Sequence, residues 1–234
     1  MDSGFASHRP QQLRHPPYAT ALVSLLCLFA FAVYSGLSPL MQQALIDIGG
    51  MRPSAVAGLF QGSAGYDRAT AWSLLTALFL HASWLHLLGN LLYFWVFGVK
   101  VEQELGWFGT LLVFLAGGAL ANLIVALRLP GLDTPIIGAS GAISAVVGAY
   151  LGLFPRRHIG LFLPLGLYLQ FARVPALFVI GSWFTLQLLY TAFGPINAAV
   201  AWWTHLAGFV LGISFALAAR GIALVRQQKG AAVR

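Results

Sequence analysis

Charged residues are scarce in this chain, and their scarcity excludes an ordinary soluble fold. Only 8% of the 234 residues are Asp, Glu, Lys or Arg, whereas about 25% is usual in a soluble domain. Hydrophobic residues make up 59% and form several continuous runs of about 20 residues, the length that crosses a bilayer as a helix. Because the runs do not alternate, they do not suit a β-barrel. We therefore expect an all-α, polytopic membrane protein.

Cysteine and carboxylates are also nearly absent. The single cysteine, Cys27, excludes an internal disulfide and a cysteine metal cluster. The six acidic residues lie in the loops and the N-terminal tail rather than inside the apolar runs. A catalytic histidine within the membrane would therefore find no carboxylate in the helices to orient it.

The chain divides into three parts. Residues 1–17 form a short polar tail, 18–220 a single membrane domain, and 221–234 a basic tail. Within the domain, six spans are expected at about 18–40, 74–99, 107–127, 136–155, 173–193 and 198–219. Residues 41–70 form an unusually long loop, which we expect to lie in the membrane interface. Residues 159–170 are apolar but contain Gly and Pro, which indicates a short re-entrant or surface segment.

The basic residues indicate the orientation. With six spans both termini face one side of the membrane, and that side carries ten basic residues against three on the other. The ten are Arg9, Arg14, Lys100, Arg156, Arg157, Arg173, Arg220, Arg226, Lys229 and Arg234. Because cytoplasmic loops are enriched in Lys and Arg, both termini are predicted to be cytoplasmic. The net charge of +7 is thus a topology signal, and no nucleic-acid partner is expected.

A serine flanked by glycines opens the fourth span. Ser140 stands between Gly138 and Gly141, and steps of four residues lead from it to Ser144, Gly148 and Gly152 on one helical face. A stripe of such small residues allows a second helix to approach at backbone contact distance. The sequence offers that partner in the sixth span, where His205 precedes Gly208 and Gly212.

These two spans enter the membrane from the same outer side. Ser140 is expected at a depth of about 6 Å and His205 at about 10 Å, at 1.5 Å per residue. Packing the two small-residue faces together would bring the hydroxyl within reach of the imidazole, as nucleophile and general base. With no carboxylate available, the mechanism would use a Ser140–His205 dyad. It is not the nucleophile elbow of α/β-hydrolases, because Ala142 stands where that motif has a glycine.

The second span supplies candidates for an oxyanion hole. His86 and Asn90 are four residues apart and share a helical face. An amide inside a membrane span indicates function. Together with the backbone N–H of Ser140 at the start of its helix, the two side chains could stabilise an oxyanion. His81 is predicted to point elsewhere and make a structural hydrogen bond.

Two readings compete with a hydrolase. An inactive relative of such an enzyme would usually lack the serine or the histidine, and this chain has both. A small transporter or proton channel would need a continuous polar path across the membrane. The inner halves of the relevant spans, such as 91–99 and 209–219, offer almost no polar residues. A cavity open only to the outer face suits a hydrolase that must admit water.

The chain resembles the rhomboid intramembrane serine proteases. The resemblance rests on the motif 138–141, the block 205–212, the segment 81–90, the lead-in 72–76 and the turn 101–106, and it covers about residues 66–220. It implies a rhomboid-like fold of six helices, with Ser140 as nucleophile, His205 as base, and His86 and Asn90 stabilising the oxyanion.

The resemblance also implies a substrate class. Its substrates would be transmembrane segments of other proteins, cut near the outer surface without a cofactor. Glu102 would cap or bridge on the cytoplasmic side. Substrate would enter past the fifth span and the loop that follows it. Apart from the resemblance, the short tails and the lack of an import-type leader lead us to expect a bacterial inner membrane.

The chain departs from the family pattern at three positions. Ser73 follows Trp72 where the family has an arginine, and Arg68 is the candidate substitute. Ser144 stands where some members have an aromatic ring stacked on the histidine. Thr204 replaces the usual alanine before the histidine.

Overall fold

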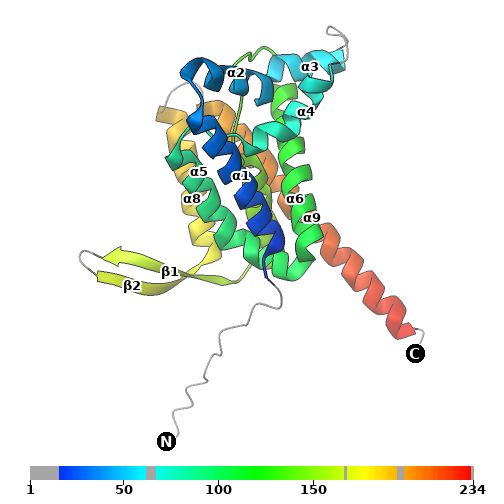
Figure 1. The fold of residues 1–234 in the computed structure, drawn as a ribbon. Helices are drawn as coiled ribbons and strands as arrows, with labels where there is room; N and C mark the ends of the chain where they lie inside the picture. The colour runs from blue at the N-terminus through cyan, green and yellow to red at the C-terminus, as the bar shows by residue number, and fades with distance from the viewer. Residues whose placement is uncertain (1–15, 62–66, 166–167, 194–197, 233–234) are drawn as a thin grey trace, which may run out of the picture.

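The computed structural model describes residues 16–61, 67–165, 168–193 and 198–232. Its elements are α1 (Tyr18–Gly36), α2 (Pro39–Gly49), α3 (Pro53–Gln61), α4 (Arg68–Thr76), the 3₁₀ turn η1 (Ala77–Phe79), α5 (Trp84–Tyr93), the π-helical turn η2 (Phe94–Gly98), α6 (Val99–Arg128), α7 (Ser140–Leu153), β1 (His158–Leu165), β2 (Tyr168–Pro175), α8 (Ala176–Phe193) and α9 (Ala198–Ala232). The long helices form a bundle (Figure 1).

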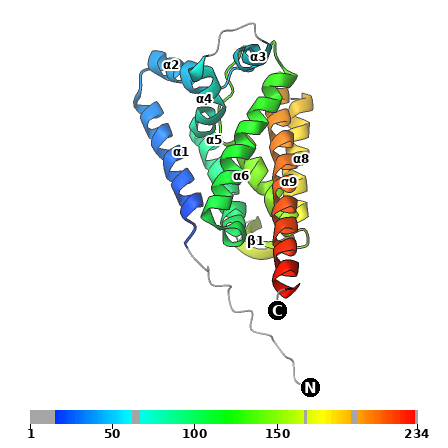
Figure 2. The same cartoon turned by 90° about the vertical axis from the view of Figure 1, so that its right-hand side faces the viewer.

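Short elements mark the two ends of the bundle. Helices α2, α3 and α4 lie at one end, and the start of α1, the end of α9 and the hairpin of β1 and β2 lie at the other (Figures 1 and 2). In its described part, the predicted loop 41–70 therefore contains most of α2, all of α3 and the first residues of α4 rather than irregular chain. The start of α1 and the end of α9 therefore lie at the same end of the bundle (Figures 1 and 2).

The apolar helices are those of a multi-pass membrane protein. In the described part of the chain, three segments are long and apolar enough to cross a bilayer: Tyr18–Gly36, Trp84–Arg128 and Trp202–Ala223. The middle segment is 45 residues long, twice what one crossing needs. Two further apolar helices, Ser140–Leu153 and Ala176–Leu186, are shorter.

The 45-residue segment is two helices that meet at Gly106. This residue has φ +75° and ψ 171°, a left-handed backbone that favours glycine. The predicted break between the second and third spans is thus a single-residue turn, and the second of the two helices begins at Trp107 as expected. The start of the second span was predicted less well: the expected helix begins at Leu74, whereas α5 begins at Trp84. His81 precedes the helix instead of lying within it.

Glu102 joins α6 to the start of α1. Its fully buried carboxylate accepts hydrogen bonds from the backbone N–H of Ala19 (2.8 Å), the N–H of Thr20 (2.9 Å) and the Thr20 hydroxyl (2.8 Å). The first N–H groups of a helix have no partner within it, and a carboxylate there also suits the helix dipole. Glu102 therefore caps α1 from a distance of more than 80 residues, on the end of the bundle that carries the start of α1.

Helix α7 lies at the centre of the bundle, packed between α6 and α9. All of its residues from Gly141 to Tyr150 are buried. A Cβ added to Gly208 of α9 would meet the carbonyl of Gly141, and one added to Gly212 would meet the carbonyl of Ala145. The two helices thus approach through backbone atoms at the small-residue faces, the arrangement that the spacing of glycines favours.

Two predictions for the second half of the chain were wrong. Residues 158–175 form an antiparallel hairpin in which His158 pairs with Pro175 and Leu165 with Tyr168, so the fold is mostly helical but not all-α. Helix α8 begins at Ala176, after the strand, rather than at Arg173. The segment predicted as a basic tail from residue 221 is helical up to Ala232, as a continuation of α9.

Candidate active site

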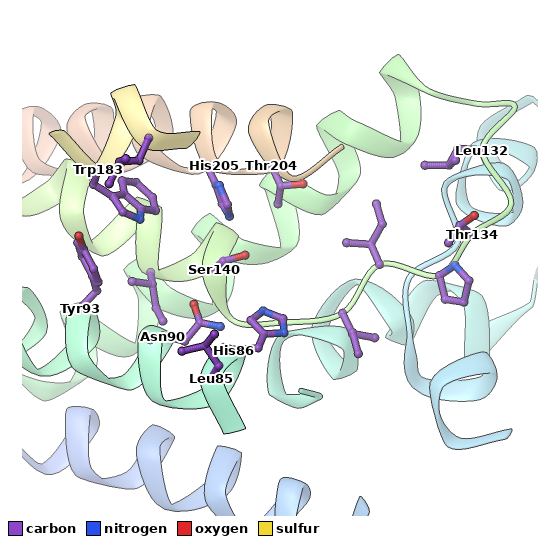
Figure 3. A pocket seen from close by; sticks show the side chains of 17 residues that line it. Leu85, His86, Asn90, Tyr93, Leu132, Thr134, Ser140, Trp183, Thr204 and His205 are labelled. Atoms are coloured by element: carbon purple, nitrogen blue, oxygen red, sulfur yellow. The ribbon is translucent and has the colours of Figure 1, made fainter. Parts of the chain in front are cut away.

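A cavity of about 830 Å³ opens where α5, α7, α8 and α9 converge. Ser140, His205, His86 and Asn90 all line it, together with the chain that precedes α7. Figure 3 shows the imidazole of His205 pointing from α9 toward Ser140, with His86 and Asn90 on the opposite side of the serine. Four residues drawn from three separate parts of the sequence therefore face one space.

Ser140 is the first residue of α7. Its backbone N–H belongs to the first turn, where no carbonyl of the same helix can accept it. Two residues earlier, Gly138 has φ +122° and donates its N–H to the carbonyl of Ala77 at 2.8 Å. A Cβ at Gly138 would stand 2.6 Å from Nε2 of His86. Only glycine lets the chain turn here and keep the imidazole of His86 close to the start of α7.

His205 is buried, with 4% of its surface exposed. Neither ring nitrogen has a hydrogen-bond partner among the described residues. The Ser140–His205 hydrogen bond of a working dyad is therefore not formed in this structure, although both residues line the cavity. Such bonds are often long before substrate binds. Among the described residues the imidazole also has no carboxylate partner.

Asn90 is held by His81. The carbonyl of Phe79 lies 3.2 Å from Nδ1 of His81, and a carbonyl can only accept, so Nδ1 carries the proton. Nε2 is then free to accept the amide N–H of Asn90 at 3.0 Å. His81 does not point away from the site, as the spacing suggested, because it precedes α5 and its ring lies 5.0 Å from that of His86.

The three departures from the family pattern are all accommodated locally. The hydroxyl of Ser73 donates to the carbonyl of Thr70 at 2.6 Å, within α4. Ser144 is fully buried, and its hydroxyl donates to the carbonyl of Ser140 at 2.7 Å. The methyl of Thr204 lies 2.6 Å from where a Cβ on Gly141 would stand. Arg68, the candidate substitute for the missing arginine, is exposed.

The loop before α7 forms one wall of the cavity and is fixed by the chain between α2 and α3. Met51 and Ile136 exchange two backbone hydrogen bonds, at 2.9 and 2.8 Å. Arg52 contacts the backbone carbonyl of Asp133 and pairs with Asp47 at 2.6 Å. The hydroxyl of Ser54 donates to Asp133 at 2.8 Å. The long first loop thus positions the segment that leads to Ser140.

Sequence reasoning missed the aromatic wall of the cavity. Trp183 of α8 and Tyr93 of α5 both line it, with ring centroids 5.5 Å apart. Their helices read as uniformly apolar, and such a pattern gives no sign of which ring faces a cavity. No signal in the sequence distinguishes Trp183 from the other aromatic residues of α8.

Comparison with known proteins agrees with this geometry. The family model described as "Rhomboid domain" matches residues 68–221. "Rhomboid protease GlpG" of Salmonella paratyphi A is 34% identical over 148 residues, which cover 62% of this chain and 47% of that protein. "Putative rhomboid protease YdcA" of Bacillus subtilis is 37% identical over 102 residues, 41% of this chain and 51% of its own.

A plant relative matches over a shorter stretch. "Rhomboid-like protein 11, chloroplastic" of Arabidopsis thaliana is 44% identical over 79 residues, 33% of this chain and 28% of that protein. The chain thus spans from about a quarter to about half the length of these relatives. The family match covers α4 to the middle of α9 and includes every residue proposed above for the site. The chain belongs to the rhomboid family.

Proposed function

We propose that this protein is an intramembrane serine endopeptidase that cleaves transmembrane segments of other membrane proteins near the outer face of the membrane. The observation that carries the proposal is that Ser140, His205, His86 and Asn90 all line the same cavity. Each residue alone is compatible with packing or with a proton path. Together they supply a nucleophile, a base and oxyanion donors, which is the minimum set for acyl transfer.

In the proposed reaction, His205 takes the proton of Ser140 as its Oγ attacks the scissile carbonyl carbon. The negative charge that develops on the carbonyl oxygen is stabilised by the backbone N–H of Ser140 and the side chains of His86 and Asn90. His205 then gives its proton to the amine as the peptide bond breaks. Water enters, gives a proton to His205 and hydrolyses the acyl ester, which releases the second product and restores the Ser140 hydroxyl.

The length of α7 supports a site beneath the outer surface. Its 14 residues extend about 21 Å at 1.5 Å per residue, whereas the hydrocarbon core is about 30 Å thick. A central helix shorter than the membrane leaves room above its first residue, and the cavity occupies that room. Lipid does not reach the helix, because its neighbours bury it. Water needed for hydrolysis would enter from above Ser140.

The proposed topology has six crossings: α1, the two halves of the segment divided at Gly106, α7, α8 and α9. An even number requires both termini on one side, and the start of α1 lies at the same end of the bundle as the end of α9 (Figures 1 and 2). The excess of basic residues at that end assigns it to the cytoplasm. The outer face then carries α2, α3 and α4, and a bacterial inner membrane is the proposed setting.

Labelling with a fluorophosphonate, which reacts with activated serines, tests the proposal. Wild-type protein in detergent should be labelled, and Ser140→Ala and His205→Ala should not be. When the same three proteins are reconstituted in vesicles with a single-span substrate, only the wild type should cleave that substrate. A folded wild-type protein that neither labels nor cleaves would indicate an inactive relative.

A further inference from the structure

The imidazole of His205 needs support from a neighbouring group. Its nitrogens have no partner among the described residues, so hydrogen bonds do not fix the plane of the ring. A base must nevertheless be held in one orientation to reach the serine hydroxyl. The support must therefore come from packing against the ring.

Helix α7 has no space for a supporting ring beneath His205. The position that could carry one is Ser144, which is fully buried and hydrogen-bonded to the carbonyl of Ser140. Its Cβ lies 3.2 Å from where a Cβ on Gly208 would stand. The backbone of α9 thus lies directly on α7 here, and an aromatic side chain at 144 would force the two helices apart.

A ring from a different helix contacts the imidazole instead. The centroid of Trp183, on α8, lies 5.3 Å from that of His205, with the planes inclined by 42°. This separation is within the range of favourable aromatic pairs. The indole also contacts Tyr93 of α5, with ring centroids 5.5 Å apart. Figure 3 shows Trp183 at the end of the cavity next to His205.

We propose that Trp183 is the positioning residue for His205, supplying from α8 the aromatic support that α7 does not provide. The proposal rests on the function proposed above, in which His205 is the base. It makes the orientation of the base depend on how α8 is docked against the bundle.

Apolar contacts dominate the docking of α8. Its side chains Leu177, Phe178 and Leu186 are 59–69% exposed. The described hydroxyls of Ser182 and Thr185 donate to carbonyls of α8 itself. Phe184 provides the main aromatic contact with α9, packing 4.7 Å from Phe209. The contacts that hold α8 are thus largely apolar and weakly directional.

The test compares two neighbouring residues of α8. Trp183→Leu removes the ring next to His205. Phe184→Leu removes a ring that packs 4.7 Å from Phe209 and 4.9 Å from the indole of Trp183, and it leaves the indole itself in place. Two rates are measured for each variant: the second-order rate of labelling by a small fluorophosphonate, and kcat and KM for a single-span substrate in vesicles. Trp183→Phe serves as the conservative replacement, and thermal unfolding establishes that each protein is folded.

We expect Trp183→Leu to lower both the labelling rate and kcat by about three- to tenfold, with KM unchanged or lower. Trp183→Phe should recover most of the loss, and Phe184→Leu should lose less than Trp183→Leu, because it keeps the indole next to His205. If the indole only blocks the entrance, Trp183→Leu will label at least as fast as wild type, and the proposal is overturned. Equal slowing by Phe184→Leu, or no recovery in Trp183→Phe, would also overturn it.

A failure of the proposed function looks different, because the wild type itself would not be labelled. Should Trp183→Leu not fold, Trp183→Met gives the same comparison with an unbranched, flexible side chain that adapts to irregular space. A Trp183→Met variant that labels as fast as wild type overturns the proposal in the same way.

Discussion

The contact between α7 and α9 leads to a sharp prediction for Gly212→Ala. One methyl group is added on α9, seven residues beyond His205 and on the face that meets α7. That methyl carbon would meet the carbonyl of Ala145, with its carbon at 2.6 Å, and the backbone nitrogen of Ala149 at 2.8 Å. These are backbone atoms of a buried helix, so no side chain can turn aside to make room.

The displacement can be worked out from these distances. Ordinary contact begins near 3.4 Å, so the carbonyl carbon of Ala145 alone requires the two helices to separate locally by about 0.8 Å, and its oxygen, which lies closer still, requires more. Overpacking of this kind costs about 1–3 kcal/mol, offset by about 1 kcal/mol from replacing a helical glycine with alanine. The free energy of unfolding should therefore fall by up to about 2 kcal/mol. The effect on activity is larger, since a misplacement of about 1 Å near reacting groups can cost a hundredfold.

The assay measures fluorophosphonate labelling and substrate cleavage beside thermal unfolding. Gly221→Ala is the matched control, because it lies on the same helix and a Cβ there meets nothing within 4 Å. We expect Gly212→Ala to lose about ten- to hundredfold in both rates and Gly221→Ala to lose nothing. Wild-type rates in a folded Gly212→Ala protein would refute the idea that this backbone contact sets the position of His205.

Four further predictions concern single side chains. Asn90→Ala should slow cleavage by about ten- to hundredfold but not abolish it, unlike Ser140→Ala, because other oxyanion donors remain; equal loss in both would contradict this. His81→Phe should slow labelling by less than Asn90→Ala does, since it only frees that amide; an unchanged rate would show that the amide needs no anchor. Glu102→Gln should lower the unfolding midpoint in detergent, because each hydrogen bond to a charged group contributes about 1.5–3 kcal/mol, while the folded fraction still labels. Hydrogen bonds, first from the Thr70 hydroxyl, lower the pKa of Asp67, so its capping of α4 is complete above about pH 3.9 and is lost as the pH falls through the lowered value. Amide protection factors in α4, corrected for the intrinsic exchange rate, should fall only in that pH range; in Asp67→Asn they should be lower at all pH values and show no such step.

The parts of the site that depend on local spacing could be predicted from the sequence. Glycines four residues apart predict close helix packing whatever the rest of the fold does, and Ser140 and His205 stand at fixed offsets from such glycines. His86 and Asn90 share a helical face by the same arithmetic. The turn at Gly106 was also predictable, because acidic residues and glycine interrupt an apolar run.

Features that depend on contacts between distant segments could not be predicted. His81 was assigned to a helix, and its five-residue offset from His86 then pointed it elsewhere; once the chain breaks before Trp84, that offset has no meaning. The hairpin of β1 and β2 was missed because a short apolar stretch with Gly and Pro fits several structures equally well. Trp183 was missed because position on an apolar helix does not tell which side faces a cavity.

The pattern of satisfied and unsatisfied polar groups gives the strongest physical argument for the role of His205. A buried polar group without a partner is costly, all the more in a membrane. Around the cavity the cost is avoided: Asn90 bonds to His81 and Ser144 to the carbonyl of Ser140. Among the described residues, the only buried side-chain polar atoms without a hydrogen bond are Nε2 of Gln103, three residues from the turn at Gly106, and both nitrogens of His205. Gln103 lies at an end of the bundle, where water is near, whereas His205 faces Ser140. A fold that satisfies its neighbours and leaves this imidazole unpaired keeps it available to take a proton.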